Sequence, residues 1–146
     1  MIRTVPMFEW ERALYQVLKA HIVGYDVFNS IAPIFVNETP PPQYINIGEY
    51  TCVPAQAKRD VADCRVTSTL HVFNRGQDKQ ELNSMFDDIA QTVSAGFDLG
   101  EFVLPQYIVH GASIEMIEAF LEEYESGETW QHGVIRIAAD LQQKEI

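Results

Sequence analysis

Two segments of the sequence constrain the fold more than any other part. The first, residues 66–75, is rich in β-branched and aromatic residues and stops at Gly76, where a helical pattern begins. The second, residues 129–141, is a closing run with Val134, Ile135 and Ile137 at its centre. Such composition between turn residues is typical of strands. We therefore expect a strand over 64–74, a helix directly after it, and a final strand over 130–141.

Two helices are indicated by apolar residues at helical spacing. The first covers residues 8–22 and ends before Gly24, and the second covers residues 78–95. Asp78 lies where a helix start favours an acid, and Gly96 is the expected C-terminal stop. Both helices should present one apolar face to the core.

Between the first helix and residue 64, the sequence predicts loops on either side of one main strand. Residues 25–43 are interrupted by Pro33 and the Pro40 to Pro42 cluster, so we expect a connection with one short strand over 34–36. Residues 44–50 are β-like. The polar stretch 54–63 predicts an exposed loop whose Lys58 and Arg59 could contact a partner.

Residues 107–124 fit two patterns. Ile114, Ile117 and Leu121 suit a helix with Ser113 as its N-cap, whereas Ile108, His110, Ala112, Ile114 and Met116 alternate as on a strand. A turn over 125–128 precedes the last strand in either case. Periodicity leaves both alternatives open.

Length and charge limit the functional class. The 146 residues fit a single domain, 1–146, with its own core. There are 21 acidic and 10 basic residues, and only two of the basic residues, Arg136 and Lys144, lie after position 96. Proteins that grip DNA phosphates need the opposite charge, so tight nucleic-acid binding is disfavoured. We expect no signal peptide and no membrane span.

No segment carries a catalytic or metal-binding signature. The four histidines are scattered, and Cys52 and Cys64 have no zinc spacing, so free thiols are expected. Phosphate loops, nucleophile elbows and His-Glu-x-x-His elements are absent from the sequence. We expect no catalytic residues, no cofactor and no metal.

Two groups of residues are candidates for contacts with partners. An acidic run without a basic residue could form a solvated outer hairpin or a negative wall along which DNA passes without adhering; it comprises Glu115, Glu118, Glu122, Glu123, Glu125 and Glu128. Aromatic residues could pack within the chain or supply a subunit interface, where such residues are enriched. These are Trp10, Phe97, Phe102 and Trp130.

The order of motifs resembles the tail-terminator, or tail-completion, proteins of long-tailed phages. The matching features are the strand entry Pro42-Gln43-Tyr44-Ile45, the strand ending at Arg75, the helix from Asp78, and the last strand entered through His132-Gly133. The resemblance implies an α+β fold, in which an antiparallel four-stranded sheet with a long C-terminal β-hairpin (107–123 and 130–141) packs against two amphipathic helices. Arg75 and His132 would then be fold or interface residues.

The same resemblance implies a structural virion protein. Members of that family form a hexameric ring on the head-proximal end of the tail tube, stop tube growth, and contact the major tail-tube protein and the head-completion (neck) protein. DNA passes through without specific binding, and the protein is in the host cytoplasm during assembly. The loop at 51–63 and the acidic run match no family motif. A head-completion protein of the same virion class and a small enzyme are the alternatives.

Overall fold

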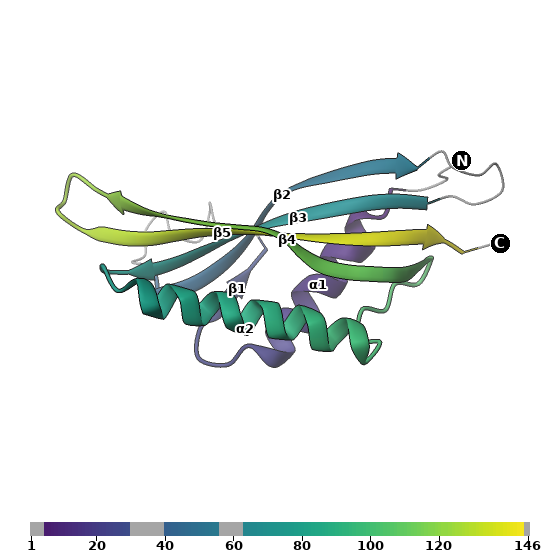
Figure 1. The fold of residues 1–146 in the computed structure, drawn as a ribbon, viewed down its shortest axis with the longest axis horizontal. Helices are drawn as coiled ribbons and strands as arrows, with labels where there is room; N and C mark the ends of the chain where they lie inside the picture. The colour runs from purple at the N-terminus through teal and green to yellow at the C-terminus, as the bar shows by residue number, and fades with distance from the viewer. Residues whose placement is uncertain (1–4, 30–39, 56–62, 145–146) are drawn as a thin grey trace.

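The computed structural model describes residues 5–29, 40–55 and 63–144 as a helix layer on a sheet. Helices α1 (Met7–His21) and α2 (Lys79–Asp98) lie on the same side of the sheet (Figure 1). The strands are β1 (Asp26–Phe28), β2 (Gln43–Ala55), β3 (Asp63–Arg75), β4 (Tyr107–Glu123) and β5 (Thr129–Gln143). The expected α+β class and the packing on two helices are confirmed.

The sheet has five strands, in the order β1-β2-β3-β5-β4, so the expectation of four was wrong. The added strand is β1, which pairs parallel with β2 over Tyr44–Asn46. Its central residue Val27 is 3% exposed, and this burial explains why a three-residue segment joins the sheet. The strand expected at 34–36 lies outside the described residues.

Side chains at alternate positions of β3 and β5 form the core. Val66, Leu70 and Val72 of β3 and Ile135 and Ile137 of β5 are fully buried, and all point to the helix side. They meet buried residues of both helices, among them Leu14, Leu18, Leu82 and Ile89. Burial of this apolar surface is the main source of stability.

Both helices occur where they were expected, but α2 ends later. Asp78 is its N-cap and accepts a hydrogen bond from the Gln80 N–H at 2.9 Å. Gly96 does not stop the helix. A Cβ at this position would lie 3.0 Å from Val17 and 3.2 Å from Phe102, so the glycine lets α1 and the following segment approach. The left-handed residue after the helix is Gly100, with φ +69°.

The long C-terminal hairpin is confirmed, and the helix alternative with Ser113 as N-cap is wrong. β4 and β5 pair antiparallel from Tyr107↔Gln143 to Glu123↔Thr129. Two bulges, between Val109 and Gly111 and between Ile114 and Met116, change which residues of β4 share a face. The hairpin extends past the first turn of α2 (Figure 1).

Two further observations concern membrane insertion and the cysteines. Neither helix in the described part of the chain has the length and apolar character needed to span a bilayer. Cys52 and Cys64 both carry free thiols. Burial, reinforced by the nearby Cys52, raises the pKa of the Cys64 thiol to about 12.

Candidate functional site

The sheet face turned away from the helices, here called the open face, carries an ordered group of polar side chains. It includes His71 of β3 and His132 of β5, which lie diagonally because His71 pairs with Val134 and Phe73 pairs with His132. Two carboxylates flank the histidines, Glu49 from β2 and Glu122 from β4. Four strands therefore contribute to one cluster.

The four side chains form a continuous chain of hydrogen bonds, here called the His–Glu chain. Glu49 Oε1 lies 2.5 Å from His71 Nε2, and His71 Nδ1 lies 2.9 Å from His132 Nε2. His132 Nδ1 contacts Glu122 Oε1, and the Tyr124 hydroxyl donates to Glu122 Oε2 at 2.6 Å. His132 has 13% of its side chain exposed, against 67% for Glu49, so the chain runs from solvent into a half-buried site.

The charges of this cluster are reflected in its pKa values. The hydrogen bond from His71 lowers the pKa of Glu49. Burial acts to raise the pKa of Glu122, but hydrogen bonds from Tyr124 and His132 outweigh it and leave that pKa lowered. The Glu122 carboxylate in turn raises the pKa of Tyr124 to about 12. Both carboxylates are thus stabilised in their charged form.

Aromatic rings enclose the His–Glu chain. The Phe73 ring stacks on His132 with centroids 4.3 Å apart, and the Phe120 ring lies 4.6 Å from His132 on the β4 side. Tyr44 stacks on Phe73 at 4.8 Å. These contacts fix the position of the imidazole of His132.

Arg75 links the end of β3 to the hairpin. Its guanidinium lies 5.0 Å from the centre of the Trp130 ring, and its Nε is 2.9 Å from Glu128 Oε1. Its Nη2 also donates to the Pro40 carbonyl at 3.2 Å. Arg75 thus makes intrachain contacts that hold the turn end of the hairpin.

The aromatic candidates for an interface pack within the chain. Trp10 is 0% exposed and donates to the Ser68 hydroxyl at 3.0 Å, so it offers no surface to a partner. Phe102 stacks on Trp10, and Trp130 is 5% exposed. Phe97 is half-buried against the same core. Lys58 and Arg59 lie outside the described residues.

The acidic run divides into two groups by its contacts within the chain. Glu122 belongs to the His–Glu chain, and Glu128 pairs with Arg75. The other four are exposed along β4 and its turn: Glu115, Glu118, Glu123 and Glu125. The sequence contained no signal for the Arg75–Glu128 pair, because its members are 53 positions apart, whereas Glu122 and His132 lie on the two arms of the expected hairpin.

The outer part of the hairpin also exposes apolar side chains. Ile117, Phe120, Leu121 and Tyr124 are each between 42% and 50% exposed. β4 is the last strand of the sheet, so its outer edge has no partner among the described strands. Unpaired strand edges with apolar side chains are ready to pair with another chain.

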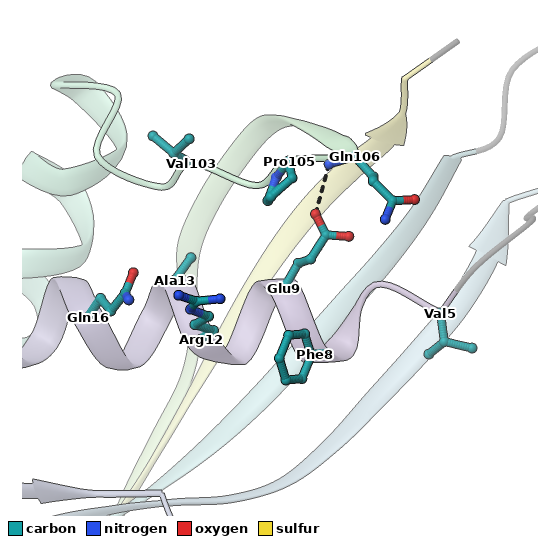
Figure 2. Close-up of a pocket in the computed structure, with 9 residues that line it drawn as sticks. All are labelled: Val5, Phe8, Glu9, Arg12, Ala13, Gln16, Val103, Pro105 and Gln106. Atoms are coloured by element: carbon teal, nitrogen blue, oxygen red, sulfur yellow. Dashed lines mark hydrogen bonds between the residues drawn. The ribbon is translucent and has the colours of Figure 1, made fainter. Parts of the chain in front are cut away.

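A separate hollow lies beside the start of α1. It has a volume of about 610 Å³ and is lined by Phe8, Arg12, Val103 and their neighbours (Figure 2). Glu9 closes one side by accepting a hydrogen bond from the Gln106 N–H at 2.8 Å. Among the described residues, no group of three or more histidines, cysteines or acids is arranged to hold a metal ion.

The elements together define a class: an α+β domain in which two helices cover one face of a mostly antiparallel sheet that ends in a long hairpin. The same fold occurs in a chain from the solved structure of the virion of native gene transfer agent (GTA) particle. The TM-score is 0.56 at 16% identity, and the match covers 90% of this chain and 93% of that chain. No family model and no curated protein matches the sequence.

Proposed function

We propose that the protein is a structural component of a phage-like virion and, more specifically, caps the head-proximal end of the tail tube as a ring. In this role it stops tube growth and provides the surface to which the head joins. The observation that carries the proposal is the fold shared with a GTA virion chain over nearly the full length of both chains. The order of sequence motifs supports the tail-terminator role in particular.

The two edges of the sheet support assembly into a ring. β4 forms one edge, and β1 covers the other edge only over Tyr44–Asn46, so β2 beyond Asn46 has no outer partner among the described strands. Tyr50 and Val53 are 54% and 62% exposed on that part of β2. Pairing the β4 edge of one copy with the β2 edge of the next is a head-to-tail contact, which closes as a ring when the rotation permits.

Charge disfavours the alternative pairing of two identical β4 edges. Glu115, Glu118 and Glu123 are exposed on β4, and two copies pairing through it would bring these like charges together. The free part of β2 carries a single acid, Glu49, whose carboxylate already pairs with His71. A β4-to-β2 contact therefore avoids most of the repulsion.

The exposed acids have a further role in this proposal. If they face the lumen of the ring, they repel DNA phosphates and let the genome pass without adhering. Replacing Glu115, Glu118 and Glu123 by Gln should then slow DNA ejection while assembly stays normal. Ejection at the wild-type rate from fully assembled particles would remove this role.

The proposal is tested by mixing the purified protein with tail tubes from the same particle and examining them by native mass spectrometry and negative-stain microscopy. We expect six-fold rings at one tube end. Val53→Glu and Ile117→Glu should abolish rings by charging the two edges, whereas Val23→Glu, at an 88% exposed site between α1 and β1, should not. A protein that stays monomeric with tubes present would contradict the proposal. Binding at the portal side instead would favour a head-completion protein.

A further inference from the structure

The His–Glu chain contains three hydrogen bonds between four titratable groups, and this restricts how many protons it can hold. Each contact needs one hydrogen: Glu49 to His71, His71 to His132, and His132 to Glu122. Both carboxylates are acceptors when ionised, so each histidine donates outward. The central contact then needs one ring nitrogen that donates and one that accepts.

Counting hydrogens gives the charge of the complete chain. Two outward N–H groups and one central N–H make three ring protons on two imidazoles, so the histidine pair carries one positive charge. The extra proton can lie on either histidine, because exchanging donor and acceptor at the 2.9 Å contact leaves the other two bonds intact. With two ring protons, one of the three hydrogen bonds is lost. With four ring protons, two N–H groups face each other at the central contact.

We propose that the His–Glu chain is a proton-controlled clasp, in which three shared protons tie β4 through β5 and β3 to β2, and a fourth proton opens it on acidification. The step is a simple protonation: one solvent proton binds the accepting nitrogen of the central contact. Two imidazolium N–H groups cannot remain 2.9 Å apart, so the rings separate. The inference does not depend on the proposed function.

Charged groups of both signs lie around the clasp. Arg136 of β5 adds positive charge near Glu49, and Arg75 of β3 is engaged with Glu128. Glu118 of β4 adds negative charge on the same face, because it pairs with Val134, the residue of β5 that also pairs with His71. Tyr44 and Tyr124 are uncharged because their pKa values are raised, and Phe73 and Phe120 add no charge. The helices pack on the opposite face, so their charged residues do not face the clasp.

Opening the clasp has a defined structural effect. Phe120 and Phe73 both rest on the His132 ring, so a rotation of this imidazole removes the support of Phe120. The backbone pairing of β4 with β5 remains, but the cross-sheet tie through side chains is lost. The outer part of β4, beyond Glu118, is then held by its pairing with β5 and, at the turn, by the Arg75–Glu128 ion pair.

The test uses the full-length protein with ¹⁵N NMR of the imidazole nitrogens between pH 8 and pH 5, because nitrogen shifts report the protonation of each site. We expect linked changes at the ring nitrogens of His71 and His132 when the accepting nitrogen of the central contact is protonated. Over the same interval, hydrogen exchange at β4 amides bonded to β5 between Glu118 and Glu122 should accelerate about tenfold, as expected for one lost charged hydrogen bond.

Two variants separate the clasp from simple loss of packing. His71→Gln should abolish the acceleration of exchange while the fold persists, because it removes the central contact, and His110→Gln, which removes an exposed histidine bonded to Gln142, should leave the acceleration unchanged. Independent titration of His71 and His132 in the wild-type protein would overturn the proposal. Unchanged hydrogen exchange across the transition would overturn it as well.

Discussion

Gly133 of β5 lies so close to Phe86 of α2 that a Cβ at position 133 would be 2.3 Å from Phe86 Cζ. The neighbouring His132 points to the open face and joins the His–Glu chain. The His-Gly pair recognised in the sequence therefore has one residue for each face of the sheet. The glycine admits a helix side chain, and the histidine joins neighbouring strands.

This contact predicts that Gly133→Ala destabilises the protein. The added methyl group forces Phe86 to move within a packed core, and such overpacking costs about 1–3 kcal/mol of unfolding free energy. Urea denaturation measures the change. Gly111→Ala is the matched control, because its Cβ would meet only Asp140 at 3.8 Å. The double variant Gly133→Ala with Phe86→Leu should recover part of the loss, and no recovery would show that the strain lies elsewhere.

Ser68→Ala should also lower stability, because it removes the acceptor of a buried N–H group. The Trp10 Nε1–H donates to the Ser68 hydroxyl, and both residues are fully buried, so the variant leaves the indole N–H without its partner. The expected cost is about 1–3 kcal/mol. Ser113→Ala, on exposed β4 surface, should change thermal unfolding little. Equal effects of the two substitutions would contradict the role of this hydrogen bond.

The acid side of the stability profile should depend on Glu122. Its pKa in the folded protein is below the ordinary 4.5, so its contribution is present above that pH and is lost as the pH falls through the lowered value. Glu122→Gln should therefore reduce the slope of unfolding free energy between about pH 5 and pH 3. Glu123→Gln, at the exposed neighbouring position, is the control. A slope identical to that of the wild type would refute the prediction.

Cys64 should react slowly with alkylating reagents. Burial raises the pKa of its thiol to about 12, and the thiolate is the reactive form, so little of it exists at pH 8. Iodoacetamide followed by peptide mass spectrometry should find Cys52 modified first in the native protein. Denaturation should remove the difference. Equal native rates would show that β2 and β3 open more often than this packing implies.

Much of the fold could be predicted because its signals are local. The helix start at Asp78 and the strand that stops at Gly76 follow from residues within a few positions, and the structure confirms both. The end of α2 was predicted too early, at Gly96. This glycine does not end the helix; it allows close packing against Val17 and Phe102, which are distant in the sequence or follow the helix. β1 was missed because three residues carry too little pattern to indicate a strand.

The site was harder to predict because its partners are far apart in the sequence. His71 and His132 are separated by 61 positions, and Glu49 joins them from a third strand. The strand pattern of residues 108–116 predicted a single shared face, but the bulges place Ile114 opposite Ile137 and Met116 opposite Arg136, on different faces. Bulges have no reliable local signature, so only the pairing itself reveals which side of β4 meets the histidines.

The acids along β4 also bear on the solubility of the isolated chain. A long uncovered strand with Ile117, Phe120 and Leu121 exposed is a site of aggregation during synthesis and storage. Glu115, Glu118 and Glu123 interrupt that stretch with charge, as gatekeeper residues do beside hydrophobic strands. Neutralising them should make the isolated protein less soluble at high concentration, so the acidic edge acts as a built-in aggregation inhibitor.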